Sequence, residues 1–195
     1  DGRPILRDVS FSVRAGEILG VAGVEGNGQR EMSEIITGLL PFARGEITIS
    51  GQSIRGRSIR EIRDMGVSHI SEDRMTYGVA ARASVAENII SDRFQKAPYC
   101  KHGFLQTRQI ESLCKKLIAE FHIKCDDSSA PVKTLSGGNM QKVVAAREFS
   151  QEPKVSIVNQ PTRGIDVGAT EFVRNKIVDL RDQGTAVLLI SADLN

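Results

Sequence analysis

Residues 134–147 have the sequence Thr-Leu-Ser-Gly-Gly-Asn-Met-Gln-Lys-Val-Val-Ala-Ala-Arg. A serine followed by glycines and a run of helix-compatible residues is typical of a helix start, because the serine side chain can accept a hydrogen bond from a free N–H of the first turn. The sequence therefore predicts a helix over residues 136–149 that stops before Pro153. Capping explains the serine, but it does not explain the Gln-Lys pair at 141–142.

Residues 23–31, Gly-Val-Glu-Gly-Asn-Gly-Gln-Arg-Glu, follow a buried-strand run and precede a helical pattern that Pro41 ends. A glycine-rich loop between a strand and a helix is the setting of a phosphate-binding loop. A working loop continues with Lys and then Ser or Thr, whereas this chain has Gln29 and Arg30. Loss of the lysine's charged hydrogen bond alone would weaken phosphate binding roughly 10- to 150-fold. The candidate loop residues are Gly23, Gly26, Asn27, Gly28, Gln29, Arg30 and Glu31.

Short runs rich in Val and Ile recur along the chain and alternate with helical stretches. This alternation predicts an α/β fold with a mainly parallel sheet. Near the N-terminus, Val9, Phe11 and Val13 alternate with serines, a period of two that predicts a half-buried strand. The other predicted strands are 18–21, 46–49, 67–70, 155–158 and 186–190.

The middle of the chain has little strand signal. An apolar helical face extends from Ile110 to Phe121, with Thr107 as its expected N-cap, and a polar loop covers 126–131. We therefore expect an α/β core from residues 1–82 and 152–195, interrupted by a helical subdomain over 83–151.

Composition excludes several classes of protein. The 195 residues are 40% hydrophobic and 26% charged, which argues against a disordered chain or a coiled coil. The net charge of +2 gives no indication of nucleic-acid binding. The three cysteines lack CxxC spacing and predict neither a zinc site nor a disulfide framework. Because the chain lacks an initial Met and stops after a strand-like run, we expect it to be cut from a longer protein, with a C-terminally truncated fold.

The LSGG-x-x-Q-K pattern at the start of a helix resembles the signature motif of ABC-type ATPases. Other blocks fall in the family's order. They resemble the Walker B strand (155–162), the D-loop with Asp166 (163–166), the switch strand (188–193) and the Q-loop (70–72). The resemblance implies a P-loop NTPase core of the ABC type, with a mainly parallel sheet, an antiparallel N-terminal β part and a helical subdomain that carries the signature.

The chain departs from this family at the positions that handle nucleotide. Asn159 stands where the family has the Asp for Mg²⁺, and Gln160 stands where it has the catalytic carboxylate. An amide cannot take a proton from the attacking water or polarise it as an anion can. We therefore expect this chain to contain no catalytic residue and no metal, and we expect its own nucleotide site to bind weakly or to be empty. The departures are Gln29, Arg30, Glu72, Asn159, Gln160 and Ala192.

The pattern is similar to the second ATPase half of tandem ABC importers for sugars and nucleosides. The matching blocks lie at 21–31, 71–74, 135–142 and 160–169. The resemblance implies three partners: an N-terminal ABC domain of the same full-length chain, transmembrane permease subunits near residues 72–94, and indirectly a solute-binding protein. It also implies a peripheral location on the cytoplasmic face of the plasma membrane.

ABC domains work as head-to-tail pairs with composite sites. The resemblance implies that Ser136, Gly137, Gly138 and Asn139 contact ATP held, with Mg²⁺, by the partner half. This half alone is then predicted to be inactive. Two alternatives stay open: a soluble ABC-type ATPase, which should keep its Lys and Walker B acids, and an interaction module of the transporter that binds no nucleotide.

Overall fold

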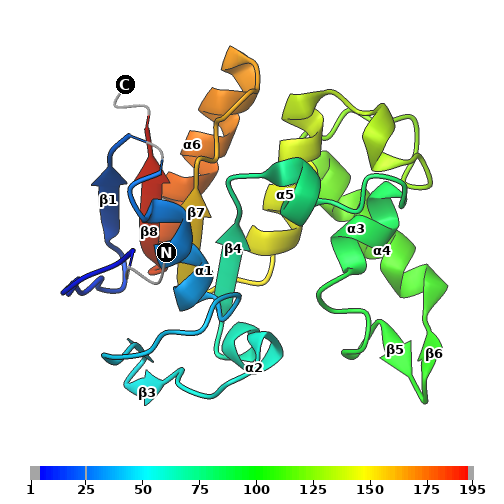
Figure 1. Cartoon of the computed structure of the whole chain (residues 1–195). Helices are drawn as coiled ribbons and strands as arrows, with labels where there is room; N and C mark the ends of the chain where they lie inside the picture. Colours follow the sequence, from blue (N-terminus) through cyan, green and yellow to red (C-terminus); the bar gives the residue numbers. More distant parts are fainter. Residues whose placement is uncertain (1–4, 25, 193–195) are drawn as a thin grey trace. The chain divides into compact units, whose positions relative to one another are not determined.

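The structure is a computed structural model that describes residues 5–24 and 26–192. The chain forms two compact units (Figure 1). Among the described residues, the α/β unit contains 5–72, apart from residue 25, together with Glu152–Pro161 and 175–192. The helical unit contains Asp73–Gln151 and Thr162–Arg174.

A parallel sheet in the order β1-β8-β7-β4 forms the centre of the α/β unit. Its strands are β1 (Ile18–Ala22), β4 (Val67–Ile70), β7 (Val155–Asn159) and β8 (Ala186–Ser191). All four were predicted from their Val and Ile content, and the α/β class is confirmed. Because the strands are parallel, their carboxyl ends share one edge of the sheet, where α/β proteins place their ligands.

Helices cover both faces of this sheet. Figure 1 shows α1 (Gln29–Ile36) in front of the sheet and α6 (Val167–Asp182) behind it. The helix predicted up to Pro41 ends earlier, because Thr37 and the left-handed Gly38 (φ 78°) close its last turn. The core is apolar and consists of Met32, Ile36, Ile49, Ile54, Ile62, Val67, Ile157, Leu188 and Ile190.

The N-terminal β prediction is partly wrong. No strand forms at residues 9–13, where Val9 is 52% and Phe11 46% exposed. Alternation alone does not make a strand, because a strand needs a paired neighbour, and no described segment pairs with this one. The antiparallel part is the small pair β2 (Thr48–Ile49) and β3 (Gln52–Ser53), followed by α2 (Ile59–Asp64).

The helical unit packs α3 (Val85–Ile90), α4 (Thr107–Glu120) and α5 (Gly137–Phe149) around buried aliphatic side chains. Thr107 is the first residue of α4 rather than its N-cap, which is Gln106 without a side-chain cap bond. Asn88 is buried and holds the preceding loop, accepting from Ala80 N (2.8 Å) and donating to Ser84 O (2.9 Å).

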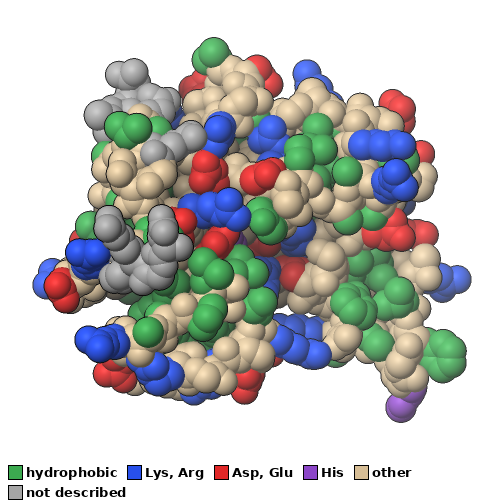
Figure 2. All heavy atoms as spheres, in the orientation of Figure 1, with side chains coloured by type: hydrophobic (Ala, Val, Ile, Leu, Met, Phe, Trp, Pro, Cys, Tyr) green, Lys and Arg blue, Asp and Glu red, His purple; other side chains and the backbone are tan. Residues whose placement is uncertain are grey.

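Smaller elements complete the helical unit. They are η1, a π-helical turn (Arg74–Gly78), the 3₁₀ turn η2 (Val132–Thr134) and the hairpin of β5 (Cys100–Lys101) and β6 (Phe104–Leu105). Figure 2 shows hydrophobic side chains at the surface of this hairpin, where Phe104 is 76% exposed. Among the described residues, no helix is both long and apolar enough to cross a membrane.

Candidate functional site

The candidate residues fall into two groups, one in each unit. The phosphate-loop segment, Glu72, Gln160 and Ala192 follow the carboxyl ends of β1, β4, β7 and β8, so they belong to one edge of the sheet. The signature residues and Asp166 belong to the helical unit. Asp193, the last residue of the predicted switch segment, lies outside the described residues.

The side chain of Gln29 folds back into the phosphate-loop segment. Its Nε2 donates to Val24 O (3.0 Å), and its Oε1 accepts from Asn27 N (3.0 Å). A Cβ on Gly23 would meet Nε2 at 2.6 Å, so only glycine leaves room for this arrangement. The Asn27 side chain adds a bond from Nδ2 to Val24 O (3.0 Å). The Gln29 carboxamide thus uses a backbone N–H that such a loop otherwise offers to a phosphate.

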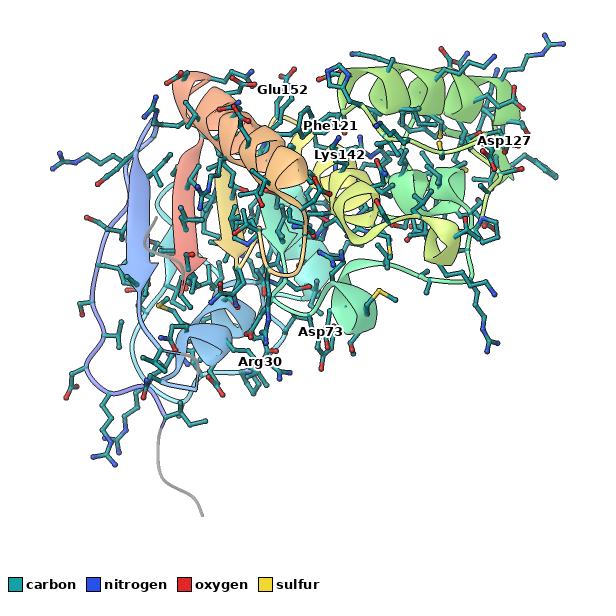
Figure 3. All side chains as sticks on the ribbon, turned by 90° about the horizontal axis from the view of Figure 1, so that it is seen from above. Arg30, Asp73, Phe121, Asp127, Lys142 and Glu152 are labelled. Atoms are coloured by element: carbon teal, nitrogen blue, oxygen red, sulfur yellow. The ribbon has the colours of Figure 1, made fainter. Side chains whose placement is uncertain are left out.

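The first turn of α1 does not favour an anion. The Arg30 Nε donates to Glu34 Oε1 (2.7 Å), so the guanidinium lies along the helix. Figure 3 places Arg30 and α1 on the side of the sheet opposite α6. Glu31, also in the first turn, places a negative side chain at the helix N-terminus. An acid there stabilises the helix dipole and repels a bound phosphate. Gly28 caps the helix with φ 96°, a left-handed backbone that suits glycine.

Asn159 is 2% exposed at the end of β7 and faces a hydroxyl. Its Nδ2 donates to Ser33 Oγ (3.4 Å), while that hydroxyl donates to Arg30 O (2.8 Å). Ser33 therefore presents a lone pair to Asn159, which suits an amide and not a carboxylate. Ser33 could not be predicted from the sequence, because a serine within an apolar helical pattern has no distinguishing signal.

The structure brings Gln160 and Ala192 together. The Gln160 Oε1 accepts from Ala192 N (3.2 Å), and Gln160 N donates to Ile190 O (2.8 Å). Gln160 has φ 49°, a strained backbone for a residue other than glycine, so its position is fixed by these contacts. Glu72 lies two residues beyond β4 and is half-buried.

The residues of this edge do not fit Mg²⁺. Mg²⁺ requires oxygen ligands, usually carboxylates. Here Arg30 supplies a cation, and Asn159 turns its NH₂ group toward Ser33. No group of three or more His, Cys, Asp or Glu side chains in the described ranges could hold a metal.

The signature forms the N-terminus of α5, as its sequence predicts. Ser136 is the N-cap, and its Oγ accepts from Asn139 N (3.3 Å) and from Asn139 Nδ2 (2.9 Å). The Asn139 Oδ1 in turn accepts from Lys124 N (2.9 Å). Lys142 Nζ donates to His122 O (3.1 Å) and lies 4.9 Å from the centre of the Phe172 ring. The first two turns of α5 are therefore bonded to the segment between the end of α4 and the polar loop.

Two glycines let the D-loop segment approach the signature. A Cβ on Gly137 would lie 3.1 Å from Gly164 O, and one on Gly138 would lie 2.6 Å from Asp166 Oδ2 and 2.8 Å from Ala169 Cβ. Asp166 is the capping residue of α6, because its Oδ1 accepts from Ala169 N (2.9 Å). The close packing explains both glycines without reference to a ligand.

Arg74 lies beside this pair of segments. Its Nη1 donates to Gln141 Oε1 (3.2 Å) and to Arg163 O (3.5 Å). Burial lowers the pKa of Arg74, and the charge of Asp73 opposes that change. The sequence analysis named Arg74 only within the block 71–74, since no spacing linked it to a glutamine 67 positions away.

Comparison with known proteins identifies the family to which the chain is similar. A family model described as "ABC transporter" matches residues 6–163. The chain is 42% identical over 193 residues to the guanosine import ATP-binding protein NupO of Bacillus subtilis. It is 40% identical over 196 residues to a glucose import ATP-binding protein of Haloferax volcanii. These alignments cover 99% and 100% of the chain but only 38% and 36% of the relatives, so the chain spans little more than a third of their length.

Solved structures share the fold. A nucleotide-free ATP-binding cassette from an ABC transporter matches with a TM-score of 0.78 at 22% identity, covering 96% of this chain and 75% of that one. A dimeric ATP-binding cassette in a post-hydrolysis state, bound to ADP and Pi, matches with a TM-score of 0.80 at 19% identity, covering 98% and 81%.

Proposed function

Because the chain belongs to the ABC transporter family, we propose that it serves as one ATP-binding half of a sugar or nucleoside importer. In this proposal it supplies the signature in trans to a catalytic ABC partner, while its own nucleotide site is silent. The observation that carries the proposal is a contrast within one chain. The signature helix keeps its serine cap and a first turn without an acidic side chain, whereas Gln29 and Gln160 at the sheet edge bond to backbone groups of this same chain.

The signature suits a role in recognising a phosphate. α5 has thirteen residues, and its first turn directs free N–H groups and a partial positive charge outward. The first turn of α5 contains no acidic side chain of its own, unlike that of α1, which contains Glu31, and the nearby Asp166 carboxylate accepts from Ala169 N as the cap of α6. Ser136, Gly137, Gly138 and Asn139 are the residues that we assign to the partner's ATP.

The proposed silence of the chain's own site has support from several side chains. Gln29 fills the loop, and Asn159 offers a donor where a metal-binding acid is needed. Gln160 has no negative charge with which to activate water, and the methyl group of Ala192 cannot donate a hydrogen bond to a phosphate. ATP and Mg²⁺ are therefore assigned to the partner's site. This contrast also favours the interaction module without its own nucleotide as a second candidate.

The proposal includes the partners that an importer needs. The catalytic ABC domain pairs with the signature face, and permease subunits contact the region 72–94, where Met75 and Tyr77 are half-exposed. A solute-binding protein acts through the permease. The chain then works at the cytoplasmic face of the membrane.

The experiment compares two helix-capping serines in the assembled transporter. Ser136 caps α5 and Ser58 caps α2, and each accepts from a backbone N–H of its own helix. Ser136→Ala and Ser58→Ala therefore cost similar capping energy. We expect Ser136→Ala, and more strongly Ser136→Arg, to lower the rate of ATP hydrolysis, while Ser58→Ala, outside the region assigned to the permease, leaves it within about twofold. Equal activities in all three variants would exclude the role in trans.

Measurement on the chain alone separates the candidates. The chain should show no ATP hydrolysis above that of a buffer blank. Robust hydrolysis by the chain alone would overturn the silent-site proposal and favour the soluble ATPase. Transport that no longer depends on Ser136 would favour the interaction module.

A further inference from the structure

We propose that Arg74 is a positioning residue that holds the signature helix and the D-loop segment in one fixed register. The inference rests on the proposed function, because the register matters only if a partner's nucleotide meets both segments. Arg74 itself contacts no nucleotide in this proposal. It acts through Gln141 and through the backbone of Arg163.

The guanidinium joins three separate segments of the helical unit. It extends from η1, donates from Nη1 to Gln141 on the second turn of α5, and reaches the carbonyl of Arg163 ahead of α6. Its Nη2 lies where a Cβ on Gly137 would approach it to 3.3 Å. The planar group therefore lies against the first signature glycine, and a displacement of Arg74 must alter the space around that glycine.

Part of the charged Arg74 guanidinium is removed from water, which is energetically unfavourable. Its Nε is buried and, in the described part of the chain, has no hydrogen-bond partner. Burial also lowers the pKa of the guanidinium. Gln141, its acceptor, is 2% exposed, so the bond between them is partly shielded from water. A half-buried arginine with a buried, unsatisfied Nε is energetically unfavourable, and it is expected where the planar, directional guanidinium fixes a geometry.

The backbone of Arg74 lies in an exposed turn. The Arg74 carbonyl accepts from Val79 N (2.9 Å) and closes η1, and a Cβ on Gly78 would contact the Arg74 stem at 3.4 Å. Met75 and Tyr77 in the same turn are 50% and 56% exposed. A protein that binds this turn would contact residues next to Arg74, whose side chain bonds to Gln141 and Arg163. This gives a direct route from an outside surface to the signature.

The test measures ATP hydrolysis and thermal unfolding of the assembled transporter with variants in this chain. Arg74→Met keeps a long side chain and removes the Nη1 donor of both bonds, whereas Arg74→Lys keeps the charge and can reach one acceptor. Arg108→Met on the exposed face of α4 is the matched control. We expect Arg74→Met to lower kcat at least tenfold with KM for ATP within threefold, since the partner's own contacts to ATP remain. Arg74→Lys should recover part of kcat, and Arg108→Met should match the wild type.

The outcomes separate this inference from the function on which it rests. If Ser136→Arg leaves hydrolysis intact, the proposed function fails, and the inference fails with it. If Ser136→Arg abolishes hydrolysis but Arg74→Met keeps the wild-type kcat, only the positioning role is overturned. A loss of activity in Arg74→Met that matches a loss of folded protein, with no recovery in Arg74→Lys, also overturns it.

Discussion

Gly138 and Asp166 lie so close that a Cβ on the glycine would come within 2.6 Å of the aspartate Oδ2. The same aspartate caps α6 through Ala169 N. The start of the signature helix and the start of α6 are thus packed around one carboxylate, and neither can change without the other.

Replacing Gly138 by alanine should therefore destabilise the protein. The methyl group forces Asp166 away from its capping position or separates the two segments, at a cost of about 1–3 kcal/mol of unfolding free energy. Gly168→Ala is the control, because its Cβ would lie 3.4 Å from Asp166 Oδ1, an ordinary contact. Urea denaturation of both variants measures the difference. Equal midpoints would show that the segments separate freely.

Replacing Asn159 by aspartate should make stability depend on pH. The position is 2% exposed, so burial raises the pKa of the new carboxyl in the folded state. When the folded-state pKa of a carboxyl is raised, its ionisation does not affect the free energy of unfolding at pH values below its unfolded-state pKa of about 4. The free energy of unfolding then falls as the pH rises from that pKa toward the folded-state pKa. We expect Asn159→Asp to match the wild type near pH 4 and to lose about 2–4 kcal/mol above pH 7.

Asn175→Asp makes the same chemical change at an exposed position of α6 and serves as the control. Denaturant unfolding at several pH values provides the comparison. A stability difference between Asn159→Asp and Asn175→Asp that does not change with pH would contradict the prediction.

Replacing Gln29 tests whether its side chain occupies the phosphate-loop segment. Gln29→Ala opens the loop and restores the Asn27 N–H as a donor. Gln29→Lys also adds a charge, which should strengthen binding of a fluorescent ATP analogue about tenfold or more over Gln29→Ala. Titration at low salt measures both. Identical affinities for the wild type and the two variants would show that the side chain does not control access.

Cys114 should be the least reactive of the three thiols. Its side chain is buried in α4, and desolvation raises its pKa to about 11. Only about 0.1% of the thiol is then ionised at pH 8, and the thiolate is the reactive form. We expect Cys114 to react with an aromatic disulfide reagent at least about tenfold more slowly than Cys100, which is half-exposed. Mass spectrometry of the folded protein measures the two reaction rates. Equal rates for Cys114 and Cys100 would contradict the prediction.

Much of the α/β sheet could be predicted, because β4, β7 and β8 are short segments rich in Val, Ile or Leu that alternate with helical stretches. The helix of the signature was also predictable from Ser136. The strand at 9–13 was wrong, since a period of two indicates a potential face but not a partner strand to pair with.

Long-range contacts could not be predicted. The bond from Arg74 to Gln141 and the approach of Gly138 to Asp166 join residues far apart in the sequence, and neither has a local signature. From the sequence, Gln29 indicated only that the lysine charge of a working loop is missing. The sequence did not indicate that the glutamine carboxamide would itself fill the loop.

The Gln29 carboxamide has a thermodynamic consequence. A ligand that binds only the folded state stabilises a protein. The stabilisation increases with the logarithm of the ratio of ligand concentration to dissociation constant. Here a tethered side chain already satisfies donor and acceptor groups of the loop. In the proposed silent site, this segment therefore gains no stability from bound nucleotide, and its folding does not depend on nucleotide supply.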